Sequence, residues 1–192
     1  MLRGVLISAK QNYMIKNNNI FFVGPMGSGK TTVGKVVAKS LNHEFLDSDQ
    51  EIEDRAGANI SWIFDVEGEE GFRDREEAII DELSLKNDIV LSTGGGAILR
   101  KENREKLKNR GLVVYLKASA EQILKRTAKD KKRPLLQTDN REQVVKDLIS
   151  KRDPLYQEIA DITIATGNGK ISEVTQDILL QIRAAGEKNN SR

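Results

Sequence analysis

Short apolar runs alternate with longer helical patterns along most of this chain. The runs have strand character and lie at Ile20–Val23, Glu44–Leu46, Ile89–Leu91, Leu112–Leu116 and Ile162–Ile164. Helical spacing of apolar residues is found in six other segments: Lys30–Leu41, Ser61–Leu83, Lys101–Asn109, Ala120–Thr127, Arg141–Ile159 and Ile171–Ala185. Strands that alternate with helices predict an α/β fold of three αβα layers, in which a parallel five-stranded sheet has helices on both faces.

The chain of 192 residues is predicted to form a single domain, because this length suits one hydrophobic core. We place the domain at residues 19–186 and expect residues 187–192 to be a frayed tail. Residues 1–18 are expected to be a flexible extension, since their last part is polar and rich in asparagine. Residues 128–140 combine many charges with a proline, and we predict that they form a mobile lid.

The composition excludes several classes of site and partner. The 31 basic residues nearly balance the 29 acidic ones, so the net charge of +2 gives no bulk field that would attract nucleic acid or membranes. With no cysteine and one histidine, disulfides, cysteine-based zinc sites and sites with several histidines are excluded. No apolar run reaches the roughly 20 residues of a membrane helix. We therefore expect a soluble, cytoplasmic protein that binds no nucleic acid and no membrane.

The glycine-rich segment GPMGSGKT, from Gly24 to Thr31, joins the first predicted strand to the first predicted helix and matches the phosphate-binding pattern G-x-x-x-x-G-K-[ST] in full. Its glycines let backbone N–H groups turn toward phosphate oxygens, and the helix N-terminus adds a positive dipole. Lys30 is expected to bridge the β- and γ-phosphates of ATP or GTP, and the Thr31 hydroxyl to be a ligand of Mg²⁺. The predicted nucleotide-binding residues of this segment are Gly27, Ser28, Gly29, Lys30, Thr31 and Thr32. The motif leaves the phosphoryl acceptor open.

Two features at the carboxyl ends of predicted strands are candidates for an acceptor site. Asp47 and Asp49 follow the second strand, where alternation would put both carboxylates on one side. The alternative is a solvated acidic turn that caps the next helix. The segment Thr93–Gly96 follows the next strand and ends in three glycines. Its bare backbone suits close contact with a small polar ligand, and its alternative is a flexible turn.

Arg73, in GFRDRE, and Arg152, in KRDPLY, are candidate ligands of a substrate carboxylate, because a guanidinium can hold a carboxylate through two hydrogen bonds. Taken singly, neither arginine is specific. A helical arginine often pairs with an acidic residue three or four positions away, and Arg73 has Glu76 and Glu77 at those positions.

In their order and separations, the motifs GPMGSGKTT, FLDSD, GFRDRE, STGGGAI, KKRPLL and KRDPLY resemble those of the shikimate kinases from Ile20 to about Leu179. The phosphate-binding motif is common to many proteins, whereas the later motifs are much more selective. The resemblance implies a P-loop NTPase fold of the nucleoside-monophosphate-kinase type. It also implies phosphoryl transfer from ATP to the 3-hydroxyl of shikimate, which gives shikimate 3-phosphate on the route to chorismate and aromatic amino acids.

The same resemblance assigns roles on the acceptor side. Asp49 would hold the ring hydroxyls, including the one that reacts, while Arg73 and Arg152 would grip the shikimate carboxylate. Asp47 would assist Mg²⁺ through water. Three glycines would contact the ring through their backbone: Gly94, Gly95 and Gly96.

Two further arginines match residues on the nucleotide side. Arg126 would pack on the adenine, and Arg133, in the predicted lid, would close over the transferring phosphoryl group. Lys30, Mg²⁺ and Arg133 would supply the positive charge that phosphoryl transfer needs, and lid closure would expel water. The predicted catalytic residues are therefore Lys30, Asp49 and Arg133.

Two other functions are considered. A related small-metabolite kinase, such as one for gluconate, would combine the same phosphate-binding loop with a different acceptor pocket, and the pair of arginines argues against it. A nucleotide-binding regulator without catalysis would be expected to lack Lys30, Asp49 or Arg133, and none is missing.

The basic run Lys129–Arg133 contains no aromatic residue of the kind that stacks on single-stranded nucleic acid. We expect a monomer, because no coiled-coil pattern is present.

Overall fold

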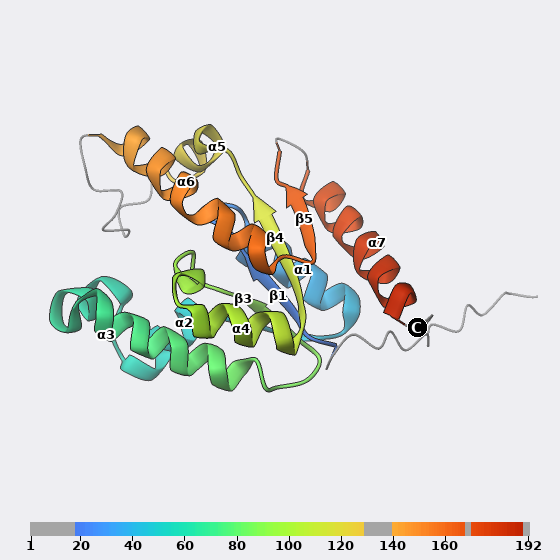
Figure 1. Ribbon diagram of the computed structural model, residues 1–192, viewed down its shortest axis with the longest axis horizontal. Helices are drawn as coiled ribbons and strands as arrows, with labels where there is room; N and C mark the ends of the chain where they lie inside the picture. Colours follow the sequence, from blue (N-terminus) through green and yellow to red (C-terminus); the bar gives the residue numbers. More distant parts are fainter. Residues whose placement is uncertain (1–17, 129–139, 168–169, 190–192) are drawn as a thin grey trace, which may run out of the picture.

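The computed structural model describes residues 18–128, 140–167 and 170–189. Within them, five parallel strands form one sheet in the order β2-β3-β1-β4-β5 (Figure 1). The strands are β1 (Ile20–Val23), β2 (Glu44–Asp47), β3 (Ile89–Ser92), β4 (Leu112–Lys117) and β5 (Ile162–Ala165). The helices are α1 (Lys30–Leu41), α2 (Ser48–Ala56), α3 (Ile60–Leu83), the 3₁₀ turn η2 (Ala97–Leu99), α4 (Lys101–Arg110), α5 (Ala120–Arg126), α6 (Arg141–Ile159) and α7 (Ile171–Asn189). The predicted α/β fold with a parallel five-stranded sheet is confirmed.

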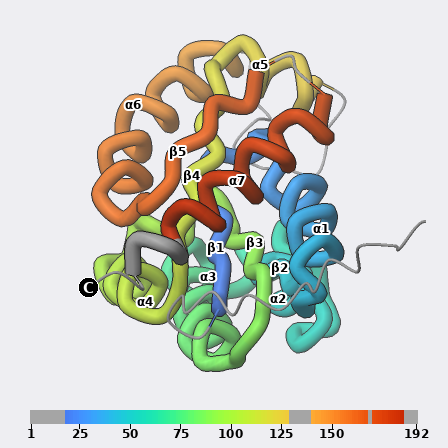
Figure 2. The backbone as a smooth tube through the Cα atoms, turned by 90° about the vertical axis from the view of Figure 1, so that its right-hand side faces the viewer, coloured from blue at the N-terminus to red at the C-terminus, as the bar shows by residue number. Residues whose placement is uncertain are grey.

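The two faces of the sheet are covered by different helices, as Figures 1 and 2 show. Successive residues of β1 point to opposite faces. Phe21 and Val23 pack in a core with side chains of α2, α3, α4 and α6, whereas Ile20 and Phe22 pack in a second core with α1 and α7. The central strands β1, β3 and β4 are buried on both faces and almost wholly apolar, which made their short runs visible in the sequence. In the edge strand β2 only Leu46 is buried, and its run was correspondingly weaker.

The parallel arrangement brings three connections to one edge of the sheet. Phe22 of β1 is in register with Ser92 of β3, and Ser92 is also in register with Asp47 of β2. The chain therefore leaves β1, β2 and β3 at the same edge, where the glycine-rich loop, the acidic segment and the three glycines lie close together.

Helix α2 was missed in the sequence, and its presence corrects the expected placement of Asp47 and Asp49. The two residues do not alternate along one strand. Asp47 ends β2 and caps α2, where its side chain accepts a hydrogen bond from the Asp49 N–H at 3.1 Å. Only Ser48 and Ile52 of α2 are buried, so this helix has too few apolar residues to give a helical pattern.

Two other helices differ from the sequence prediction. Helix α3 is broken at Gly68, which has a φ of 73° and a ψ of −177°. A side chain there would meet nothing within 4 Å, so the backbone conformation rather than packing favours glycine. Helix α7 continues to Asn189, and its last three residues belong to the segment that we expected to be frayed.

Several expectations fall on residues that are not described. They concern most of the extension at residues 1–18, most of the lid at residues 128–140 with Arg133, and the last three residues of the chain. None of the helices in the described part of the chain could span a membrane, because none is both long and apolar enough.

Leu83, the last residue of α3, and Leu85, two positions beyond it, test which side chains belong to the core. Leu83 is 1% exposed and Leu85 is 61% exposed. We expect Leu83→Ala to lower the free energy of unfolding by about 2–5 kcal/mol, because it leaves a cavity. The matched change Leu85→Ala should alter it by no more than about 0.5 kcal/mol. Urea denaturation followed by circular dichroism measures both, and equal losses would contradict the assignment.

Candidate active site

The loop between β1 and α1 has the backbone conformation of a phosphate-binding loop. Gly24, Gly27 and Gly29 have φ angles of 143°, 71° and 97°, which residues with a side chain rarely adopt. Gly29 is also the N-cap of α1, and it lines the cavity beside the loop. The first amides of α1 therefore lie where a phosphate would gain from hydrogen bonds and from the helix dipole.

Lys30, the first residue of α1, is buried against this loop. Its ammonium group donates hydrogen bonds to the carbonyls of Gly24 at 2.8 Å and Pro25 at 3.0 Å. A charged group that lies among backbone oxygens at the cavity wall is placed to interact with an incoming phosphate.

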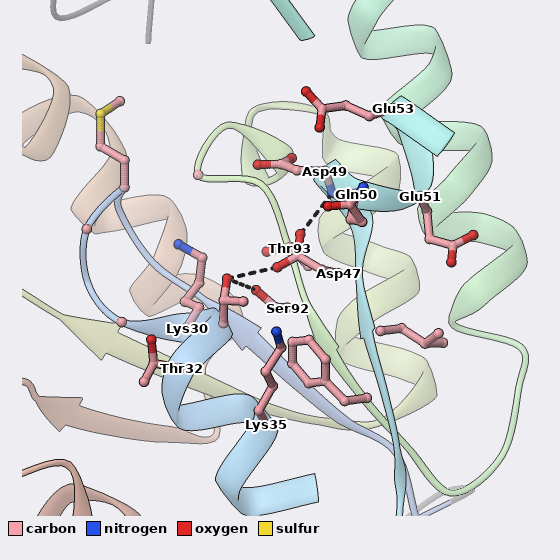
Figure 3. A pocket seen from close by; sticks show the side chains of 17 residues that line it. Lys30, Thr32, Lys35, Asp47, Asp49, Gln50, Glu51, Glu53, Ser92 and Thr93 are labelled. Carbon is pink, nitrogen blue, oxygen red and sulfur yellow. Dashed lines mark hydrogen bonds between the residues drawn. The ribbon is translucent and has the colours of Figure 1, made fainter. Parts of the chain in front are cut away.

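Three oxygen-bearing side chains meet where α1, β2 and β3 come together (Figure 3). The Thr31 hydroxyl donates to the Asp47 carboxylate at 2.8 Å and lies 3.5 Å from the Ser92 hydroxyl. Among the described residues no group of three acidic, histidine or cysteine side chains could hold a metal ion. The oxygens of Thr31 and Asp47 nevertheless fit Mg²⁺. This ion usually takes only one or two ligands from the protein and completes its coordination with water molecules and the phosphate oxygens of the nucleotide.

A cavity of about 570 Å³ joins the phosphate-binding loop to the acidic segment. The loop and α1 contribute Met26, Gly27, Gly29, Lys30, Thr31, Thr32 and Lys35 to its wall, while the facing residues include Asp47, Asp49, Gln50, Glu51, Glu53 and Gly95. Figure 3 shows Asp49, Glu51 and Glu53 on the opposite side of the cavity from Lys30 and Thr32, whereas Asp47 reaches across to α1. Asp49 therefore shares one space with all the predicted nucleotide residues of the loop except Ser28, which borders a second cavity.

The three glycines after β3 allow side chains from other elements to approach the backbone. A methyl group on Gly94 would lie 2.6 Å from both the Asp49 and the Glu76 carboxylates, and one on Gly96 would collide with the Arg73 guanidinium. The Gly94 N–H donates to the Ser48 hydroxyl at 3.0 Å, which fixes the loop to α2. Any larger residue would displace these groups.

Arg73 lies on α3 with two carboxylate partners of different exposure. It pairs with Glu76 at 2.6 Å and with Glu69 at 3.1 Å, and the side chains of these residues are 1% and 62% exposed. Burial acts to lower the pKa of Arg73, but the two carboxylates outweigh it and raise the pKa. The helical pairing with Glu76 that we considered as an alternative is thus present, while Glu77 pairs with Arg100 instead.

Arg152, on α6, is buried and donates to the Gly95 carbonyl at 3.2 Å. The Asp49 and Glu76 carboxylates lie against Gly94 and the Arg73 guanidinium lies against Gly96, so these groups gather with Arg152 around the glycine loop. Neither arginine lines the cavity of about 570 Å³. Arg152 instead borders a small pocket together with Pro25 and Met26 of the phosphate-binding loop.

From the sequence, Glu76 was predicted only as a possible ion-pair partner of Arg73, and no role in the site was assigned to it. Burial raises its pKa to about 7 against the lowering effect of Arg73, while Asp49 raises it further and Arg152 lowers it. One of its oxygens is buried without a hydrogen-bond partner. Its spacing from Arg73 indicated an ion pair, but only the fold shows that the pair is buried.

Arg126 connects the phosphate-binding loop to the segment after β5. It donates to the Gly27 carbonyl at 3.1 Å, the Thr166 carbonyl at 3.1 Å and the Gly167 carbonyl at 3.0 Å. It also lines a second cavity of about 660 Å³, with Gly29, Thr32 and Ile171. This cavity continues from the phosphate-binding loop on the side where the nucleoside is expected.

Comparisons with known proteins identify the relatives of this chain. A sequence model of the family described as Shikimate kinase matches residues 26–183. The chain is 55% identical over 166 residues to the shikimate kinase of Vibrio vulnificus, which covers 86% of this chain and 96% of that protein. The solved shikimate kinase from Acinetobacter baumannii in complex with shikimate has a TM-score of 0.85 at 54% identity, over 88% of this chain and 94% of that one. A gluconokinase from Sinorhizobium meliloti, with a TM-score of 0.61 and 16% identity over 91% of this chain and 97% of that one, shares the fold alone.

The raised pKa of Glu76 predicts a pH-dependent contribution to stability. Because the folded state holds this proton more tightly than the unfolded state, the contribution is complete below the ordinary pKa of 4.5 and is lost as the pH rises through about 7. Relative to the wild type, the unfolding free energy of Glu76→Gln should therefore increase with pH over this range, by up to about 3 kcal/mol.

Urea denaturation at a series of pH values measures this difference. Glu77→Gln is the matched control, since hydrogen bonding to Arg100 lowers the pKa of Glu77 and keeps this group ionised above pH 4.5. Its difference from the wild type should stay flat over the same range. A flat difference for Glu76→Gln as well would contradict the raised pKa.

Proposed function

The chain belongs to the shikimate kinase family, and from this premise we propose that it transfers the γ-phosphoryl group of ATP to the 3-hydroxyl of shikimate with the residues gathered at the glycine loop. The observation that carries the assignment is that Asp49, Arg73 and Arg152 all lie against the backbone of the three glycines, which itself lies beside the phosphate-binding loop. A carboxylate-bearing polyol needs both an anion grip and a hydroxyl acceptor within one site, and this group supplies both.

We infer that Arg73 and Arg152 hold the substrate carboxylate. Two buried guanidiniums with few buried acidic partners favour an anionic ligand, because each unpaired buried charge is costly. The solved relative in complex with shikimate supports a shikimate site in this family. The backbone of Gly94, Gly95 and Gly96 would then contact the ring.

Asp49 is assigned to the reacting hydroxyl. It lines the cavity that Lys30 and Gly29 also line, so an acceptor bound beside Asp49 faces the phosphate-binding loop. The carboxylate accepts a hydrogen bond from the hydroxyl and directs its oxygen toward the γ-phosphorus. The new oxygen–phosphorus bond forms as the bond to ADP breaks, and the proton leaves toward Asp49 or water.

Positive charge for the transfer comes from the nucleotide side. Lys30 and the N-terminal amides of α1 bind the phosphates, and Arg126 borders the nucleoside cavity. The Thr31 hydroxyl would hold Mg²⁺ directly and Asp47 would act through water; when bound, this ion neutralises phosphate charge. The roles of Arg133 and of a lid concern residues outside the described part of the chain and stay predictions, as do the monomeric state and the cytoplasmic location.

A panel of acceptors tests the proposed function. With ATP and Mg²⁺, we expect ADP release with shikimate and none with gluconate or nucleoside monophosphates. Asp49→Asn should lower kcat by about 100-fold or more, because it removes the charge that orients the hydroxyl. Asp54→Asn is the control, since Asp54 is exposed on the same helix, and it should leave kcat unchanged. Turnover of gluconate without turnover of shikimate would reject the acceptor.

Glu69 provides a second test, directed at the carboxylate grip. Its exposed carboxylate pairs with Arg73 and would have to yield that contact to the substrate carboxylate. We therefore expect Glu69→Gln to lower the KM for shikimate about two- to threefold, the size of an exposed ion pair. Glu67→Gln is the matched control, because it breaks a pair with Arg75 on the same helix and should leave KM unchanged. A raised KM in Glu69→Gln would show that Glu69 supports Arg73 rather than competing for it.

A further inference from the structure

The Gly95 carbonyl accepts two hydrogen bonds from the same helix. The Tyr156 hydroxyl donates to it at 2.5 Å and Arg152 donates to it at 3.2 Å. The two donors are four residues apart on α6, so they lie on one face of the helix. A carbonyl oxygen has two lone pairs, and both are used here.

Tyr156 is held rigidly in this position. Its side chain is 1% exposed, and its ring stacks on that of Tyr115 with the ring centres 4.9 Å apart. The hydroxyl of Tyr115 donates elsewhere, to the Asp153 carboxylate at 2.6 Å. Burial raises the pKa of Tyr156, so its phenol stays protonated and remains a donor at all ordinary pH values.

On its other side, Gly95 lies against the phosphate-binding loop. A methyl group on Gly95 would be 3.2 Å from the Met26 nitrogen and 3.5 Å from the Gly24 carbonyl oxygen. The glycine loop is therefore confined between the phosphate-binding loop and the donors of α6. The hydrogen bond from Tyr156 fixes where the Gly95 peptide lies between these two boundaries.

We propose that Tyr156 is a positioning residue of the acceptor site, which sets the glycine loop and Arg152 in place through their shared contact with the Gly95 carbonyl. The inference rests on the proposed function, in which the glycine loop and Arg152 contact the acceptor. Tyr156 acts through these groups and does not touch the substrate.

The expected consequence is a selective loss of acceptor binding. Without the Tyr156 hydroxyl, Arg152 is left as the donor to Gly95, and both the arginine and the loop gain freedom that shikimate must remove on binding. The phosphate-binding loop keeps its own hydrogen bonds from Lys30, so nucleotide binding should be preserved.

Steady-state kinetics of Tyr156→Phe test the proposal, with Tyr115→Phe as the matched control. Both changes remove one buried hydroxyl and keep the stacked rings. We expect Tyr156→Phe to raise the KM for shikimate about five- to tenfold, the value of one hydrogen bond, with kcat and the KM for ATP within about twofold of the wild type. Tyr115→Phe should leave all three constants within about twofold, even where its urea midpoint falls as much as that of Tyr156→Phe.

The outcomes separate the two proposals. Unchanged shikimate KM in Tyr156→Phe, or an equal rise in both variants, would overturn the positioning role while the wild type still turns over shikimate. A wild type that does not phosphorylate shikimate would overturn the proposed function and this inference with it. Shikimate titration by calorimetry on the same variants gives a readout independent of turnover, and equal affinities for wild type and Tyr156→Phe would also overturn the positioning role.

Discussion

The backbones of two glycine-rich loops lie against each other at the carboxyl ends of the strands, and the geometry of the site depends on this contact. Gly95 faces the backbone of Gly24 and Met26 at distances that a side chain would increase. The contact follows from the topology, because β1 and β3 are neighbouring parallel strands whose carboxyl ends share an edge. The separation between the phosphate-binding loop and the acceptor site is therefore set by peptide groups, which are stiffer than side chains, and in-line transfer needs that stiffness.

The charges behind the glycine loop impose a second constraint. Arg73 and Arg152 are buried, and Glu76 is the acidic residue that is buried with them. Its raised pKa reflects the cost of holding a third charge away from water, against the attraction of the two guanidiniums. The two positive charges of this cluster are neutralised most fully when the carboxylate of a bound ligand adds a second negative charge. In the proposed function, the same burial that makes the cluster costly in the free protein would make it selective for an anionic acceptor.

The sequence predicted the parts of the fold that leave a periodic or motif-based signal. The buried strands, the long helices and the phosphate-binding loop were all visible in this way. Helix α2 was not, because its nine residues bury only two side chains, and the break at Gly68 depends on a backbone angle that no pattern encodes. The spacing of Arg73 and Glu76 indicated an ion pair, but whether a pair is a solvated surface contact or a buried site depends on tertiary packing. The contact of Tyr156 with Gly95 joins residues 61 positions apart and had no local signal.

This difference explains why nucleotide binding is easier to predict from the sequence than the choice of acceptor. The donor side is built mainly from one contiguous segment, Gly24–Thr32, so its chemistry can be inferred from the segment alone. The proposed acceptor site takes residues from α2, α3, the loop after β3 and α6, and the fold alone brings them together. A gluconokinase shares the overall fold at 16% identity, and a fold alone does not determine function. We therefore expect acceptor specificity to depend on the separated residues around Glu76 and on the contacts that hold them, rather than on the scaffold.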